Sequence, residues 1–141
     1  MQRTLAICKP DCLARALAGE VLSRIEAGGF RVVGMKMIRL TRSQAGSFYD
    51  VHREKPFYPE LLDFMTEGPV VVAVLEKSDA VESWRALMGA TNPANAAEGT
   101  IRRDLAESMS RNVVHGSDSP ENARREIAFF FSESELLAAE K

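Results

Sequence analysis

The pattern of apolar residues predicts four strands in this 141-residue chain. Residues 4–8 and 70–75 are short apolar runs with the length of buried strands. The second run is apolar at consecutive positions, which is typical of a central strand covered on both faces. Residues 30–40 alternate less regularly and predict a third strand. Residues 112–115, where two valines lead into His115, predict a short fourth strand.

Helical spacing of apolar residues, or a helix-start signal, marks the segments between and after these strands. The predicted helices cover residues 13–25, 41–51, 61–65, 79–88, 101–108 and 121–131. Thr41 with Gln44, and Asp79 with Glu82, fit the capping-box pattern. Ser119 suits the N-cap of the last helix, because its hydroxyl can accept a hydrogen bond from a free amide of the first turn.

The order of these elements predicts the fold. Two β-α-β units with a helical hairpin between them are typical of the ferredoxin-like α+β arrangement, a four-stranded antiparallel sheet with helices on one face. We expect residues 1–141 to form a single domain, since neither a linker nor an internal repeat is visible. Residues 89–99 read as a long irregular loop, and such loops in small domains are usually functional or interfacial.

The composition narrows the class of protein. Hydrophobic residues make up 45% of the chain, charged residues 27%, and the net charge is −2. These values are typical of a globular protein without a broad basic surface for nucleic acid. We see no signal-peptide pattern, and no apolar run approaches the roughly 20 residues of a membrane helix. Cys8 and Cys12 flank a predicted turn, which favours reduced thiols over a disulfide. Reduced thiols in turn favour a cytoplasmic location.

His115 is the first candidate for chemistry, because it lies beside a predicted helix N-terminus whose free amides attract anions. A histidine there can be a base, a metal ligand, a phosphate acceptor or a hydrogen-bonded structural residue. The chain has no P-loop motif, so cations for phosphate binding must come from separate positions such as Lys9, Arg85 and Arg102. Neither arginine shows a packing role in the sequence, so we expect Arg102→Gln to change the melting temperature little.

Several strings around these residues resemble one family. They are Asn112-Val-Val-His-Gly-Ser-Asp-Ser, Ile7-Cys-Lys-Pro-Asp, Trp84-Arg-Ala-Leu-Met-Gly-Ala-Thr-Asn-Pro, Gly99-Thr-Ile-Arg and Lys55-Pro-Phe. Together they resemble the nucleoside diphosphate kinases, and the resemblance extends from Arg3 to about Glu135. It implies that the chain moves the γ-phosphate of a nucleoside triphosphate, typically ATP, to a nucleoside diphosphate. The implied mechanism is ping-pong, through a phosphohistidine, and it maintains nucleoside triphosphate pools.

The resemblance also implies roles for single residues. His115 would carry the phosphate covalently, with Ser117 and Glu126 as a supporting pair near its imidazole. Lys9 and Asn112 would contact the ribose hydroxyls, and Lys9 would also approach the phosphates.

The remaining implied contacts concern the nucleotide and its metal. Arg85, Thr91 and Arg102 would hold the β- and γ-phosphates. Phe57 would stack on one face of the base and Met109 on the other, which predicts wide base and sugar tolerance because stacking reads only a π-face. The implied cofactor is Mg²⁺, bound mainly by the nucleotide phosphates, and Asp118 would meet it through water.

The resemblance further implies homo-oligomers, with dimers assembled into tetramers or hexamers and the 89–99 loop as a contact. Arg103, Leu105 and Cys12 depart from the residues that are commoner in the family, but they touch local packing rather than the transferring groups. Specific nucleic-acid binding is not expected. His52, the other histidine, reads as a helix C-terminal cap or a surface residue.

Two other classes of function compete with the kinase. A phosphohistidine hydrolase would pass the phosphate from the histidine to water instead of to a diphosphate. A non-catalytic nucleotide- or RNA-binding module on a ferredoxin-like sheet would display aromatic residues on its strands, whereas the strands here are aliphatic and Phe57 lies in a predicted turn.

Overall fold

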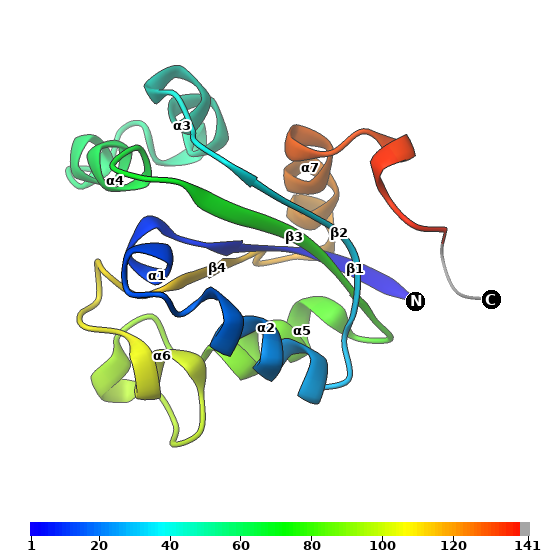
Figure 1. The fold of residues 1–141 in the computed structure, drawn as a ribbon. Helices are drawn as coiled ribbons and strands as arrows, with labels where there is room; N and C mark the ends of the chain where they lie inside the picture. Colours follow the sequence, from blue (N-terminus) through cyan, green and yellow to red (C-terminus); the bar gives the residue numbers. More distant parts are fainter. Residues whose placement is uncertain (139–141) are drawn as a thin grey trace.

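A computed structural model describes residues 1–138 and contains one four-stranded sheet (Figure 1). The strands are β1 (Gln2–Cys8), β2 (Arg31–Ile38), β3 (Val70–Lys77) and β4 (Val114–Gly116). Their order is β2-β3-β1-β4, and each strand is antiparallel to its neighbours. β3 therefore lies between β1 and β2, and β1 lies between β3 and β4, which is the split β-α-β pattern of the ferredoxin-like fold. The predicted fold class is confirmed.

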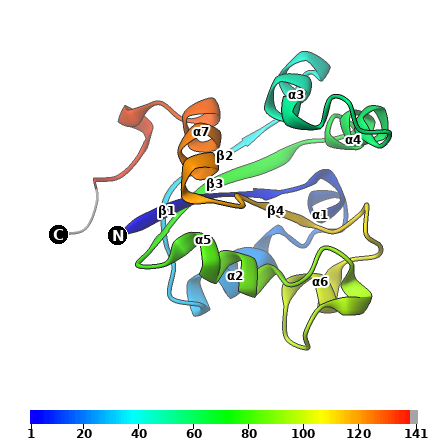
Figure 2. The ribbon, with the colours of Figure 1, turned by 180° about the vertical axis from the view of Figure 1, so that it is seen from behind.

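Helices cover both faces of this sheet, so the expectation of helices on one face is wrong (Figures 1 and 2). The described residues form α1 (Pro10–Ala14), α2 (Ala18–Ala27), α3 (Arg42–Phe48), α4 (Tyr58–Met65), α5 (Ala80–Met88), α6 (Ile101–Leu105) and α7 (Pro120–Phe130), with 3₁₀ turns at Asp50–His52, Pro93–Asn95 and Glu133–Glu135. Leu5 and Ile7 of β1 pack in a core with α3, α4 and α7. Ala6 and Cys8 pack in a second core with α1, α2, α5 and α6. Because consecutive residues of β1 and β3 are apolar, both faces of the sheet had to be buried.

The predicted helix over residues 13–25 is two helices, α1 and α2, with a break at Ala16. Ala16 has a φ of 57°, in the left-handed region that ends many helices. The amide of Leu17 donates to the carbonyl of Cys12, and the amide of Ala16 donates to Leu13, so the break is a Schellman motif with alanine where glycine is usual. The break turns the chain from the end of α1 into α2.

One of the two predicted capping boxes is present. Thr41 and Gln44 exchange the two expected hydrogen bonds at the start of α3. Asp79 precedes α5 but accepts no capping bond, so the second capping box is wrong. Asp79 has φ −129° and ψ 48°, outside the extended region that an N-cap residue normally adopts. The Gln2 side chain instead accepts the free amide of Val81 in the first turn, at 2.8 Å. Helices α3 and α6 also end before the predicted residues 51 and 108, at Phe48 and Leu105.

No helix within residues 1–138 is both long enough and apolar enough to cross a bilayer.

Candidate active site

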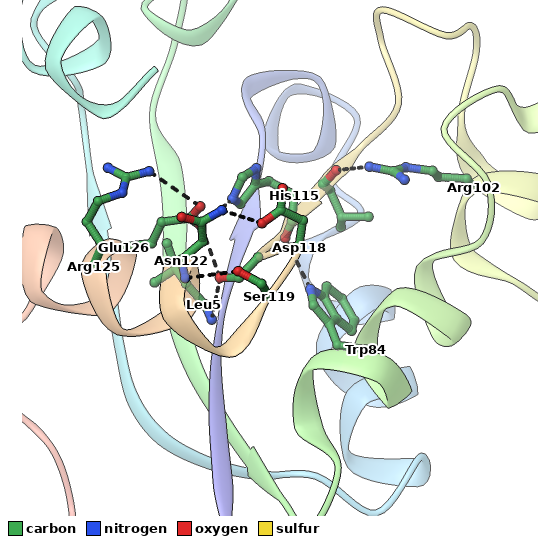
Figure 3. A network of polar contacts seen from close by, with 11 residues as sticks. Leu5, Trp84, Arg102, His115, Asp118, Ser119, Asn122, Arg125 and Glu126 are labelled. Carbon is green, nitrogen blue, oxygen red and sulfur yellow. Dashed lines mark hydrogen bonds and ion pairs between the residues drawn. The ribbon is translucent and has the colours of Figure 1, made fainter. Parts of the chain in front are cut away.

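His115 lies on the short strand β4, opposite Ile7 of the central strand β1. Its backbone carbonyl accepts a hydrogen bond from the Trp84 indole at 3.1 Å (Figure 3). Gly116 comes next, and a Cβ built there would lie 2.6 Å from both Trp84 and Met88. Only glycine therefore lets β4 approach α5 so closely, and this contact fixes the backbone that carries the histidine.

The His115 imidazole is held by a carboxylate through its Nε2 atom. Nε2 lies 2.7 Å from Oε1 of the buried Glu126, and the Ser117 hydroxyl donates to the same oxygen at 3.0 Å. The amide of Leu5 donates to the Ser117 hydroxyl at 3.3 Å, which ties the group to β1. A carboxylate accepts hydrogen bonds, so Nε2 carries the proton and Nδ1 keeps its lone pair.

The predicted cap of α7 brings Glu126 to the histidine. The Ser119 hydroxyl accepts from the amide of Asn122, and Pro120 occupies the first helical position. Burial lowers the pKa of His115, although the carboxylate of Glu126 opposes this effect. The imidazole is therefore neutral at pH 7, as a nucleophile requires.

Lys9 and Asn112 form a second buried pair beside the histidine strand. Lys9 Nζ donates to Oδ1 of Asn112 at 2.8 Å, and both side chains are buried. Burial and, to a smaller extent, the charge of the nearby Arg102 guanidinium lower the pKa of Lys9 to about 8. The chain enters β4 through Val113, whose φ is 76° and whose amide donates to the carboxylate of Asp11 at 3.0 Å. Asp11, in the first turn of α1, thus holds the residue that precedes the histidine strand.

Arg102 is buried and bonded to backbone, which corrects the expectation that it has no packing role. Its guanidinium donates to the carbonyls of Val114 at 2.7 Å, Gly89 at 3.1 Å and Asn112 at 3.3 Å. Burial, together with the charge of Arg85, lowers the pKa of Arg102 to about 10. The arginine therefore ties α6 both to the end of α5 and to β4.

A cavity of about 460 Å³ brings four of the predicted residues together. Its lining comes from α5, the 89–99 loop, α6 and β4, namely Arg85, Ala86, Met88, Gly89, Ala90, Thr91, Ala97, Thr100, Arg102, His115 and Gly116. Two arginines and a threonine hydroxyl beside a neutral histidine suit a phosphate group. A cavity of about 600 Å³ near α7 and the start of β1 holds none of the predicted site residues, so its greater volume does not locate the chemistry.

The predicted base-binding residues lie outside this cavity. Phe57 immediately precedes α4 and is 48% exposed, whereas Met109 lies in the segment between α6 and β4 and is 61% exposed. His52, predicted as a cap or surface residue, is half-buried, and its ring lies 5.5 Å from that of Phe57 and 6.4 Å from that of Tyr49.

Asp118 is exposed and accepts a hydrogen bond from the Asn122 side chain. That bond lowers the pKa of its carboxyl, and Arg85 adds to the effect, so the group is ionised at neutral pH. Residues 1–138 contain no cluster of three or more residues able to hold a metal ion. One ionised carboxylate near a phosphate-sized cavity fits a magnesium ion carried chiefly by nucleotide phosphates.

Sequence reasoning missed three residues around the histidine. Trp84 and Asp11 hold the backbone on either side of it, as described above. Tyr49 is buried with its ring 6.1 Å from that of His115, and its hydroxyl finds no partner within residues 1–138. Burial raises the pKa of this hydroxyl, so it remains a donor. Its position four residues after Ala45 on the buried side of α3 was the available signal.

Comparisons with known proteins assign the class. Residues 2–136 match the family model described as "Nucleoside diphosphate kinase". A nucleoside diphosphate kinase of Pelobacter propionicus is 61% identical over 137 residues, which is 97% of this chain and 100% of that protein.

Solved structures agree. The nucleoside diphosphate kinase of Aquifex aeolicus has a TM-score of 0.95 at 44% identity, covering 96% of this chain and 99% of that one. The kinase of Halobacterium salinarum in complex with CDP has a TM-score of 0.94 at 40% identity, covering 99% and 93%. The chain belongs to the nucleoside diphosphate kinase family, and it is an enzyme that acts as a nucleotide kinase.

Proposed function

We propose that this enzyme transfers the γ-phosphate of a nucleoside triphosphate, typically ATP, to a nucleoside diphosphate through a phosphohistidine at His115. The observation that carries the proposal is the hydrogen bond between Nε2 and Glu126, which leaves Nδ1 as the free nucleophile at a cavity with two arginines. The proposal includes a role in maintaining nucleoside triphosphate pools, which fits an enzyme that accepts any nucleoside diphosphate.

The two half-reactions are balanced without a proton leaving the ring. In the first, the Nδ1 lone pair attacks the γ-phosphorus, and the bond from phosphorus to the bridging oxygen breaks to release the nucleoside diphosphate. The imidazole becomes positive, and Glu126 stabilises it through the Nε2 hydrogen bond. In the second, a terminal oxygen of the acceptor diphosphate attacks the phosphorus, the bond from phosphorus to Nδ1 breaks, and its electron pair restores the neutral imidazole.

The cations would act on the transferring phosphoryl group. Arg85, Thr91 and Arg102 would hold the β- and γ-phosphates, and the backbone bonds of Arg102 support its role because they fix its guanidinium before the substrate arrives. Lys9 and Asn112, already paired, would meet the ribose hydroxyls, with the ammonium group near the phosphates. Magnesium, held by the nucleotide phosphates and through water by Asp118, would neutralise part of their charge.

The exposed ring of Phe57 supports stacking on any base, with Met109 on the opposite face. We expect purine and pyrimidine diphosphates, in both ribo and deoxy forms, to serve as acceptors in a competition assay. Rejection of all but one base by more than about a hundredfold, the discrimination of a dedicated hydrogen-bonding site, would disprove recognition by stacking alone.

We also propose a cytoplasmic homo-oligomer, with dimers joined into tetramers or hexamers. Within residues 1–138, β2 is an outer strand that pairs only with β3, and the amide of Leu137 donates to its Val33 carbonyl. Its exposed side chains Met35 and Met37 support a contact between copies, because an outer strand is usually covered. Sedimentation of the native protein tests this, and a monomer at micromolar concentration would contradict it.

The decisive experiment is labelling with ATP carrying a labelled γ-phosphate, in the presence of magnesium. We expect one acid-labile, base-stable label, as for a phosphoramidate. His115→Ala should abolish it and His52→Ala, the control at the other histidine, should retain it. Rapid loss of the label to water without a diphosphate would favour the hydrolase instead.

A further inference from the structure

Arg111 ties the segment between α6 and β4 to α4. Its guanidinium donates to Oε1 of Glu67 at 2.6 Å and lies 4.9 Å from the centre of the Phe64 ring. Phe64 is in α4, and Glu67 follows this helix by two residues. In both ribbon views, the segment before β4 lies at the same end of the sheet as α4 (Figures 1 and 2).

The tied segment is a closed turn held together by its own hydrogen bonds. The amides of Glu107 and Ser108 donate to the carbonyl of Arg111, whose own amide donates to the Ser108 hydroxyl. The Asn112 side chain donates to the carbonyl of Met109 at 3.1 Å. A shift of the Arg111 side chain is therefore passed to Met109 and to Asn112.

The partner of this turn, α4, carries the other predicted base contact. Phe57 is the N-cap residue of α4, and its carbonyl accepts the amide of Leu61 at 3.0 Å. Helix α4 thus joins Phe57, at its start, to its C-terminal end, where Arg111 contacts Phe64 and Glu67. Eight helical residues span about 12 Å, so the two ends move together.

We propose that Arg111 is a positioning residue that sets the separation between the two sides of the nucleotide entrance. Phe57 on α4 is one side, and Met109 with Asn112 on the turn is the other. This inference rests on the proposed function, because it concerns how the kinase holds a nucleoside. Arg111 does not line the phosphate cavity, so we expect its main effect on the base and ribose.

The test separates binding of the nucleoside from phosphoryl transfer. In Arg111→Gln, KM for nucleoside diphosphates should rise roughly threefold to tenfold, the range that an exposed ion pair with a cation–π contact supports, while kcat stays within twofold. The inhibition constant of inorganic pyrophosphate, which has no base or ribose, should not change. Glu67→Gln should raise KM in the same sense, and the double variant should fall short of additivity.

The matched control is Arg42→Gln, which breaks another exposed ion pair of α4, with Asp63, away from the turn. It should leave KM and kcat unchanged. The inference is overturned if Arg111→Gln keeps the KM of the parent, if it weakens pyrophosphate equally, or if it lowers only kcat and the melting temperature. The proposed function fails separately, when the parent enzyme itself is not labelled at His115 by ATP.

Discussion

The candidate site has an inner and an outer region that differ in burial. The inner region consists of polar side chains that are buried and already hydrogen-bonded, namely Lys9, Arg102, Asn112, Ser117 and Glu126. The outer region consists of exposed residues, namely Phe57, Arg85, Thr91, Met109 and Asp118. Inner groups are part of the folded structure and are preorganised for the reaction, so changing them should affect stability and rate together. Outer groups should affect rate or binding alone.

Arg102 and Arg85 line the same cavity but belong to different regions, so substituting them gives the largest expected difference between the regions. Either change to glutamine should slow phosphorylation of His115 by two to three decades, the effect of losing about 2–4 kcal/mol of transition-state stabilisation. Arg102→Gln should also lower the free energy of unfolding by about 2–4 kcal/mol, because three carbonyls lose a charged donor.

Arg85→Gln should change that free energy by less than about 0.5 kcal/mol. Single-turnover labelling and urea denaturation on the same preparations measure both quantities. Arg103→Gln, the exposed neighbour, is the control and should resemble the parent in both. Equal destabilisation by the two cavity arginines would remove the distinction between the regions.

The pH dependence of the reaction tests two groups of the site, His115 and Lys9. Below its lowered pKa, His115 gains a proton and loses the nucleophilic lone pair, so the rate should fall only at pH values under its ordinary 6.5. Above the pKa of Lys9, about 8, the ammonium charge is lost and kcat/KM should fall about tenfold per pH unit. Lys9→Arg, which does not titrate there, should lose this alkaline limb. A parent profile still rising at pH 9 would contradict a role for the charge of Lys9.

Tyr49 gives the smallest expected effect, because one neutral hydroxyl is removed. Its hydroxyl is buried and has no partner among residues 1–138, and we expect it to donate to the phosphoryl group on His115. Tyr49→Phe should slow phosphorylation about fivefold to tenfold and leave the free energy of unfolding unchanged. Tyr58→Phe, which loses a bond to the Gly46 carbonyl, should show the reverse: about 1 kcal/mol less stability and an unchanged rate. If neither Tyr49→Phe nor Tyr58→Phe changed the rate, the Tyr49 hydroxyl would be excluded as a donor to the phosphoryl group.

The sequence was sufficient for elements with local signals. The apolar runs predict β1 and β3, and Ser119 with Pro120 predicts the start of α7, because strand burial and helix capping depend on a few neighbouring residues. The resemblance supplied the candidate residues, and four of them do line one cavity.

Features set by distant contacts could not be predicted. The left-handed Ala16 that separates α1 from α2 carries no glycine signal. The packing role of Arg102 depends on carbonyls of residues 89, 112 and 114, which only the fold brings within reach. The bond between the Val81 amide at the start of α5 and the Gln2 side chain likewise joins residues nearly 80 positions apart.

The position of the phosphate on the histidine ring is the most direct test of the proposed mechanism. We predict Nδ1 of His115, because Nε2 is bonded to Glu126 at 2.7 Å. Nitrogen-15 NMR of the enzyme phosphorylated by ATP, with histidine labelled on the ring, distinguishes the two nitrogens through their coupling to phosphorus. Phosphorus coupled to Nδ1, with Nε2 still protonated, is the predicted result. Phosphorus coupled to Nε2, or a phosphate on His52, would contradict it.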